Sequence, residues 1–175
     1  MLKNKRILTI VSNDYDDLEF HYPLIRLTEA GIKVDIASEV KGHTYKGKYG
    51  LSTKSDLSFD EVDINNYDGI IIPGGWAPDY LRRLPKVLEF VKYLNDQKKL
   101  IGAICHAGWV LSSAGILNGV TMTSTPGIKD DMMYAGATWV DQPVVVHNHI
   151  ITARRPIDLP FYLPKLIEAL VKKED

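Results

Sequence analysis

The sequence contains a single cysteine, Cys105, among 175 residues. One cysteine excludes an internal disulfide and is typical of the reducing cytoplasm. Long apolar runs are also absent, because no stretch approaches the roughly 18 residues that a membrane-spanning helix needs. The first residues show no signal-peptide cleavage pattern. We therefore expect a cytoplasmic protein with no membrane partner.

An excess of charge of either sign is missing as well, since the net charge is −1 at pH 7. A broad basic surface, which nucleic acids and anionic membranes attract, is excluded. Aromatic residues and lysines alternate between Tyr45 and Tyr49, but this stretch is short and is interpreted as part of a hairpin. We expect no nucleic-acid partner.

Apolar segments of strand type alternate with helical patterns along the whole chain. This order predicts an α/β protein with a mostly parallel sheet that is covered by helices on both faces. No repeat or linker interrupts it, so residues 1–175 are expected to form one domain. Strands are predicted at residues 6–12, 33–38, 69–73 and just before Cys105; helices at 16–30, 86–97, 105–114, 126–135 and 159–172; hairpins at 42–50 and 144–153.

Cys105 follows a buried strand and precedes a helical pattern, with an abrupt turn between them. A thiol at a helix N-terminus meets unpaired N–H groups and the positive end of the helix dipole, and both favour the reactive thiolate. The context is typical of a nucleophile elbow. A buried structural thiol is the alternative interpretation.

The histidine directly after this cysteine, His106, is a candidate general base or a cation that stabilises the thiolate. Adjacent residues do not automatically face one another, so His106 can equally be a polar residue in the first turn of a helix. Asp79 is a candidate acid to orient the histidine; otherwise it is an acid in the first turn of a helix.

Two further features are predicted at the carboxyl ends of strands, where ligands bind in folds of this class. Gly74 and Gly75 follow a core strand and are either a plain turn or a place where free N–H groups stabilise an oxyanion. Glu19 lies four residues before Pro23, which cannot donate to its carbonyl, so the chain is distorted or only beginning its helix there. A carboxyl group buried beside the thiol would exchange protons with it and have a raised pKa.

His147 and His149 form a His-x-His pair. Two ligands do not make a zinc site, and the asparagine between them is a turn residue. We interpret the pair as a hairpin tip and predict no metal site.

Taken together, these motifs resemble the PfpI-type family of intracellular proteases and deglycases, within the superfamily that has a class I glutamine-amidotransferase-like fold. The resemblance covers nearly the whole chain. Its carriers are Asp17-Leu18-Glu19 with Pro23, Pro73-Gly74-Gly75 with Ala77-Pro78-Asp79, Ala103-Ile104-Cys105-His106, residues 125–131 with Ala135-Gly136, and residues 152–156 with Asp158-Leu159-Pro160.

This resemblance implies a flavodoxin-like three-layer α/β/α sandwich and a homo-oligomer, either a dimer or a hexamer. It also implies that Cys105 is the nucleophile and Glu19 its carboxylic partner. Oxyanion donors would come from Gly74, Gly75 and the His106 amide. In members described as proteases, an acid from a neighbouring subunit completes a Cys-His-acid triad, and Asp79 occupies that position.

The chain departs from the family pattern at two places, and Trp76 adds bulk beside them. The family usually has glutamate where Asp79 stands, and Cys-His-Gly-Pro where this chain has Cys105-His106-Ala107-Gly108. Trp76 follows the glycine pair, where its bulk is expected to cap the pocket. The Cys105–Glu19 pair is therefore the firmer prediction, and the triad is the weaker one.

We predict a stress-protective cysteine enzyme that needs no cofactor and acts on small reactive carbonyls or glycated amines, of the glyoxalase III or deglycase type. One alternative is an intracellular peptidase that uses Cys105, His106 and a neighbouring subunit's Asp79. A second alternative is an oxidation sensor without catalysis, in which Cys105 becomes a sulfinate held by Glu19 and backbone amides.

Overall fold

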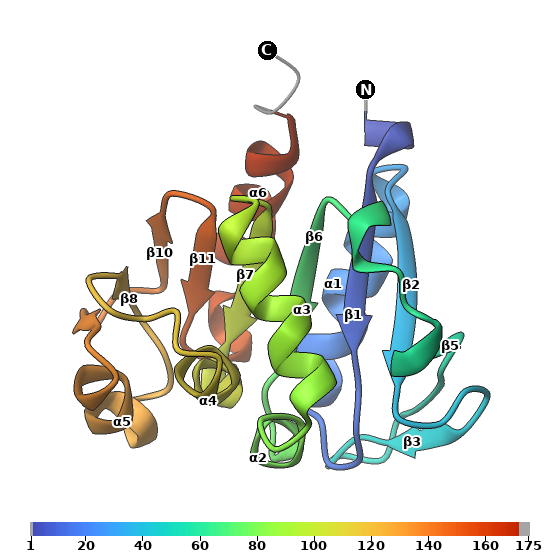
Figure 1. The fold of residues 1–175 in the computed structure, drawn as a ribbon, viewed down its shortest axis with the longest axis horizontal. Coiled ribbons are helices and arrows are strands. Elements are labelled where there is room, and N and C mark those ends of the chain that lie inside the picture. Colours follow the sequence, from blue (N-terminus) through green and yellow to red (C-terminus); the bar gives the residue numbers. More distant parts are fainter. Residues whose placement is uncertain (1, 172–175) are drawn as a thin grey trace.

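A seven-stranded sheet forms the centre of the computed structural model, which describes residues 2–171 (Figure 1). Its strand order is β10-β11-β7-β6-β1-β2-β5, and only the β10–β11 pair is antiparallel. The strands are β1 (Arg6–Ile10), β2 (Lys33–Ser38), β5 (Leu57–Ser58), β6 (Gly69–Ile72), β7 (Leu100–Ile104), β10 (Val144–His147) and β11 (Ile150–Ala153).

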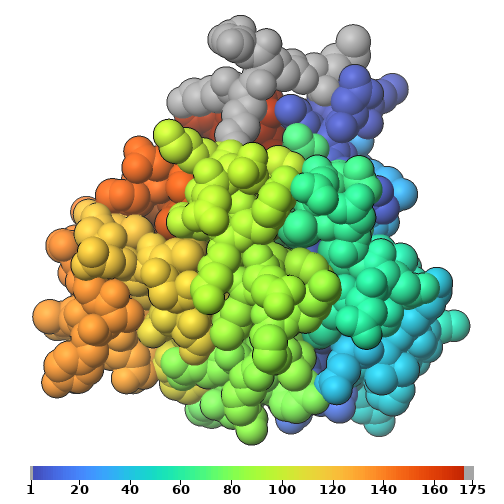
Figure 2. Space-filling model, in the orientation of Figure 1, coloured from blue at the N-terminus to red at the C-terminus, as the bar shows by residue number. Residues whose placement is uncertain are grey.

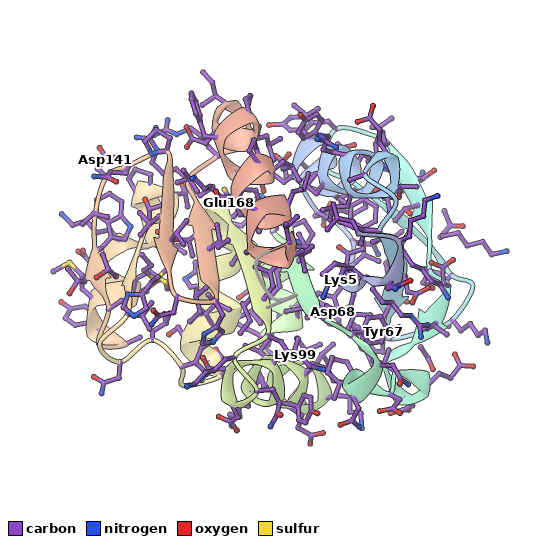
Figure 3. All side chains as sticks on the ribbon, turned by 90° about the horizontal axis from the view of Figure 1, so that it is seen from above. Lys5, Tyr67, Asp68, Lys99, Asp141 and Glu168 are labelled. Atoms are coloured by element: carbon purple, nitrogen blue, oxygen red, sulfur yellow. The ribbon has the colours of Figure 1, made fainter. Side chains whose placement is uncertain are left out.

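Helices cover both faces of this sheet. The helices α1 and α6 pack together on one face, whereas α3 and α4 lie on the other, as the end-on view in Figure 3 and the front view in Figure 1 show. The flavodoxin-like three-layer α/β/α prediction is confirmed. The helices are α1 (Asp17–Glu29), α2 (Ala77–Leu81), α3 (Pro85–Asp96), α4 (Gly108–Ser113), α5 (Lys129–Tyr134) and α6 (Leu159–Val171).

Four short strands lie outside the main sheet. Strands β3 (Thr44–Lys46) and β4 (Ser52–Lys54) form an antiparallel hairpin, and β8 (Thr121–Met122) pairs in parallel with β9 (Thr138–Trp139). Short 3-10 turns complete the described chain at Leu2–Asn4, Phe59–Glu61, Ile64–Asn66, Cys105–Ala107, Pro126–Ile128 and Pro156–Asp158.

The central strands are apolar along their whole length because both of their faces are covered. Every residue of β6 and β7 is buried. Alternate side chains enter two apolar clusters: Ile70 and Ile72 belong to one, and Ile71 to the other. Each such fully buried side chain contributes about 1.5–3 kcal/mol to folding. In Figure 2, α3 lies over the middle of one face of the sheet.

At the amino ends of the strands, Asp68 joins two neighbouring strands. Its carboxylate accepts the Arg6 N–H at 2.9 Å and lies 3.7 Å from Lys5 Nζ. Figure 3 shows Lys5 and Asp68 together at this end. These ionic contacts lie at the amino ends of the strands. Ligands bind at the carboxyl ends in folds of this class.

The carboxyl ends of β1, β6 and β7 lie side by side. From β1 the chain passes first to β2 on one side and later to β6 on the other, which makes β1 and β6 the switch point of the sheet. Ligands bind at such a point in open α/β sheets. The segments that leave these three strands carry Glu19, Gly74 with Gly75, and Cys105.

The long elements agree with the sequence predictions, and the short ones differ. The helix expected from Cys105 is instead a 3-10 turn, Cys105–Ala107, followed by the six-residue α4. The helix expected from residue 126 similarly begins with a 3-10 turn. Strands β5 and β9 were not predicted, because two residues carry too little periodicity to be recognised, whereas α2 corresponds to the alternative that places Asp79 in the first turn of a helix. Residue 172, the predicted end of the last helix, lies outside the described residues.

Candidate active site

Cys105 lies at the sharp turn that the sequence predicts. Ile104, the last residue of β7, is extended, and Cys105 has a φ of 61°. This left-handed conformation is uncommon for a residue with a side chain and costs about 1–3 kcal/mol, and such strain clusters at functional sites. A hydrogen bond from Thr125 N to Cys105 O at 3.3 Å supports the turn.

Glu19 reaches the site from the first turn of α1. The Asp16 side chain caps this helix by accepting Leu18 N at 3.1 Å and Glu19 N at 3.2 Å. Glu19 is fully buried, and its Oε2 accepts the Gly74 N–H at 2.8 Å. Its Oε1 has no hydrogen-bond partner among the described residues. Pro23 lies inside α1 and Glu19 is the third residue of that helix, so the expectation that the helix is only beginning at Glu19 is confirmed.

Burial, followed by the nearby Asp16 charge, raises the pKa of Glu19 to about 8. The Gly74 N–H, which donates to Glu19, and the neighbouring Cys105 side chain act in the opposite direction. Loss of hydration outweighs these two effects because a buried carboxylate has no water to stabilise its charge. Glu19 therefore carries a proton at neutral pH, as the sequence predicts for a carboxyl group buried beside the thiol.

The glycine pair permits the close approach of all three segments. A side chain at Gly74 would collide with Glu19 Oε2 and the Cys105 Cβ. Gly75 has a φ of 77°, and a side chain there would meet the backbone of Asp14. Only glycine suits either position without displacing the acid, the thiol or the β1 segment.

The predicted oxyanion donors differ in availability. The Gly74 N–H is engaged by Glu19, so it is not free to meet a substrate oxygen while that bond persists. The backbone N–H groups of Gly75 and His106 act to lower the pKa of the Cys105 thiol. These two amides are the better placed donors, and the role of Gly74 stays a prediction.

Burial, followed by the Glu19 charge, raises the pKa of the Cys105 thiol to about 12. The expectation that the turn favours thiolate is therefore wrong for the free protein: loss of hydration exceeds what two amides and a single 3-10 turn supply. Charge on either group opposes charge on the other, so the pair titrates as a unit. With Glu19 protonated, its charge no longer opposes the thiolate.

His106 contacts the thiol directly, because its Nδ1 lies 3.3 Å from Cys105 Sγ. The rings of Trp76 and Trp109 flank the imidazole, each with its centroid 5.0 Å away. Burial, followed by the Lys48 charge, lowers the pKa of His106. The imidazole is therefore neutral at neutral pH and is able to accept the thiol proton. Trp76 itself is 59% exposed, and its predicted role as a cap of the pocket stays a prediction.

Asp79 does not join this group within one chain. It is exposed on α2, where its carboxylate pairs with Arg83 at 2.8 Å. The hydrogen-bond partner of the His106 ring among residues 2–171 is Cys105. A contact between Asp79 and the histidine of a neighbouring subunit stays a prediction.

The two later histidines have separate partners. His147 Nδ1 accepts the Thr121 N–H at 3.2 Å, whereas His149 Nε2 lies 3.0 Å from the Asn95 side-chain oxygen. Asn148 between them turns the β10–β11 hairpin with a φ of 55°, as predicted. No group of three or more potential metal ligands occurs within the described part of the chain.

Three residues near the site were not identified from the sequence. Asp16 caps α1, and an aspartate just before a helical pattern is a recognisable signal for that role. Lys48 and Tyr162 carry no such signal, because long-range packing brings them to Glu19. The Tyr162 hydroxyl is fully buried and has no hydrogen-bond partner in the described structure.

None of the helices within residues 2–171 is long and apolar enough to cross a membrane.

Comparison with known proteins adds an independent line of evidence. The sequence pattern described as the DJ-1/PfpI family matches residues 5–169. "Deglycase PH1704" of Pyrococcus horikoshii is 40% identical over 165 residues, which cover 94% of this chain and 99% of that protein. Bacillus subtilis YraA, whose name proposes a cysteine protease, is 36% identical over 156 residues, 89% of this chain and 92% of that one. Drosophila melanogaster DJ-1beta has a solved structure with a TM-score of 0.90 and 28% identity, covering 95% of this chain and 90% of that one.

Proposed function

This chain belongs to the DJ-1/PfpI family, and from that premise we propose that it is a cysteine enzyme of stress protection that acts on small reactive carbonyls and their amine adducts. Relatives named deglycase and a relative whose name proposes a cysteine protease support an enzyme. The observation that carries the choice of carbonyl chemistry is the buried Glu19 carboxyl, which is protonated at neutral pH and lies beside Cys105 at the glycine turn, where a side chain at Gly74 would meet both residues.

The first step joins the sulfur to the aldehyde carbon of a compound such as methylglyoxal. As the Sγ–C bond forms, the thiol proton passes to the neutral His106 Nδ1. Glu19 gives its proton to the aldehyde oxygen, and the Gly75 and His106 N–H groups stabilise charge on that oxygen as it develops. The product is a hemithioacetal on Cys105, with Glu19 now a carboxylate.

The second step uses that carboxylate as a base. Glu19 removes the hydrogen of the former aldehyde carbon as a proton. The electron pair moves to the neighbouring carbonyl oxygen, and this oxygen takes the proton from His106. The product of this step is an enediol attached to Cys105. Glu19 then returns its proton to the neighbouring carbon, while the first hydroxyl loses its own to His106. The result is a thioester of a hydroxy acid.

Hydrolysis completes the cycle. Water adds to the thioester carbon, the C–S bond breaks, and the hydroxy acid leaves while Cys105 regains its proton. On an amine adduct the Sγ–C bond forms as the C–N bond breaks, the thiol proton passes to His106, and Glu19 gives its proton to the departing amine nitrogen. The amine is released in repaired form, and the same hemithioacetal and Glu19 carboxylate result. No cofactor enters these steps, and we place the reaction in the cytoplasm.

The test is methylglyoxal turnover in matched variants. Replacing the nucleophile, Cys105→Ser, or the proton carrier, Glu19→Gln, is expected to lower turnover by about a hundredfold or more. The control Glu29→Gln alters an exposed glutamate on the same helix and keeps wild-type turnover. Turnover that survives Cys105→Ser would contradict the proposal.

A second function, peptide hydrolysis, is favoured by the 3.3 Å contact between Cys105 Sγ and His106 Nδ1. It requires a homo-oligomer, a dimer or a hexamer, in which a neighbouring subunit supplies Asp79. Peptide cleavage by a verified monomer, or cleavage unaffected by Asp79→Ala, would exclude this triad.

A further inference from the structure

The hairpin formed by β3 and β4 closes on the segment that leaves β1. Tyr15 forms isolated bridges with both Gly47 and Gly75. The Lys48 N–H donates to Tyr15 O at 3.0 Å, and the Asp14 N–H donates to Lys46 O at 2.8 Å. The hairpin loop and the glycine turn of the active site are therefore held by the same few residues.

The carboxylate of Asp17 fixes the loop from its other side. It accepts the Tyr49 N–H at 2.8 Å and the Leu51 N–H at 2.7 Å. Asp17 begins α1, two residues before Glu19. Because its backbone is anchored on both sides, Lys48 has a defined position beside the start of α1.

The Lys48 ammonium group lies at the edge of the catalytic cluster. Its Nζ is 3.3 Å from Asp16 Oδ2, with 30% of its side-chain surface exposed against 4% for Asp16. The positive charge acts on both Glu19 and His106. Lys48 is thus partly open to solvent and pairs with Asp16, whose N–H donates to Gly74 O at 3.1 Å in the glycine turn of the site.

The negative groups around Lys48 are already engaged. Asp16 caps α1, Asp17 holds the hairpin, and Glu19 is protonated at neutral pH. An ammonium group has three donors; the ion pair with Asp16 uses one of them, and the Tyr49 ring lies 4.9 Å from the Nζ on another side. An anion that enters from solvent therefore meets the half-exposed cation before it meets the buried acids.

We propose that Lys48 forms an anion subsite at the mouth of the active site, which selects carbonyl compounds bearing a carboxylate. This inference rests on the proposed carbonyl chemistry: the carboxylate lies against the ammonium group while the carbonyl carbon meets the Cys105 sulfur. A single lysine suits a carboxylate better than a phosphate, which is usually bound by several donors or by the free N–H groups of a helix. At α1 those N–H groups are occupied by Asp16.

The test compares two alkylating agents of nearly equal size, anionic iodoacetate and neutral iodoacetamide. In both cases the sulfur forms a bond to the CH₂ carbon and iodide leaves. Because Cys105 is the sole cysteine, the intact mass of the full-length protein reports its modification alone. The ratio of the two rate constants isolates the charge preference, because any change in thiolate fraction affects both agents equally.

Lys48→Met is expected to lower the iodoacetate-to-iodoacetamide ratio by about three- to tenfold, the effect of one partly exposed charge at close range. Lys48→Arg restores the ratio. Lys46→Met removes an exposed lysine of the same hairpin and leaves the ratio unchanged. The difference between wild type and Lys48→Met shrinks as salt is added.

An unchanged ratio in Lys48→Met overturns the subsite, and so does a parallel fall in both rates, which marks a purely structural role. The readout requires no turnover, so it is separate from the proposed function. A lowered ratio in a protein without methylglyoxal turnover supports the subsite and contradicts the carbonyl reaction. Normal methylglyoxal turnover with an unchanged ratio supports the carbonyl reaction and overturns the subsite.

Discussion

At the scale of single residues, the chemistry of this chain depends on which of Glu19, Cys105 and His106 carries a proton. Glu19 is buried and Cys105 is partly buried, and the Glu19 charge raises the pKa of the Cys105 thiol. Burial alone would make both groups inert. The neutral His106 at 3.3 Å from the sulfur and two backbone N–H groups provide the means to move the thiol proton when a carbonyl arrives.

The raised pKa of Glu19 has a consequence for stability. Between its ordinary value of 4.5 and about 8, the folded protein keeps a proton that the unfolded chain releases. The folded state then binds more protons, so the free energy of unfolding falls as pH rises through this interval. We expect a loss on the order of a few kcal/mol from pH 5 to pH 8.5.

Urea unfolding at both pH values checks this expectation. Glu19→Gln keeps an oxygen for the Gly74 N–H but has no proton to release, so its stability varies less with pH. Glu29→Gln, on the exposed side of α1, retains the wild-type dependence. Equal pH dependence in wild type and Glu19→Gln would show that Glu19 is not protonated in the folded state.

The site residues differ in how readily they are identified from the sequence. Cys105, Glu19 and the glycine pair are recognisable, because each follows a core strand and the carboxyl ends of parallel strands meet. The protonation of Cys105 was predicted wrongly, since a sequence shows the helix that follows a thiol but not how completely the thiol is buried. The contact of His106 with the sulfur depends on a φ of 61°, which the sequence leaves open.

At the scale of elements, the β3–β4 hairpin is more than a connection. The sequence predicts a hairpin here but gives no indication that it lies against α1. That contact joins segments about thirty residues apart through the carboxylate of Asp17. Tertiary packing therefore decides that Lys48 belongs to the active site.

The Asp17→Asn variant tests this attachment. An asparagine side chain offers one acceptor oxygen, so one of the Tyr49 and Leu51 N–H groups loses its partner. We expect the free energy of unfolding to fall by about 1–3 kcal/mol. Hydrogen exchange of these two amides is expected to accelerate.

Asp60→Asn, at an exposed position, serves as the control and leaves both measurements unchanged. If Asp17→Asn leaves exchange at Tyr49 and Leu51 as slow as in wild type, Asp17 does not anchor the hairpin.

At the scale of the whole molecule, the sheet order explains why one edge is reactive. Alternating apolar strands and helices predict the three layers, and the carboxyl-end rule predicts the edge. The strand order itself, with β10 antiparallel at one end and β5 at the other, depends on pairings between distant segments that local pattern does not specify. Short elements such as β5 and β9 were missed for the related reason that two residues have no clear period.

The central claim is that Cys105 attacks the carbonyl carbon and Glu19 then moves the proton between adjacent carbons. Carbon-13 NMR of Glu19→Gln with labelled methylglyoxal tests both roles at once. The account predicts a persistent hemithioacetal signal and almost no lactate, with the signal lost in the Cys105→Ser, Glu19→Gln double variant. Lactate formed at the wild-type rate by Glu19→Gln, with no adduct on Cys105, would contradict it.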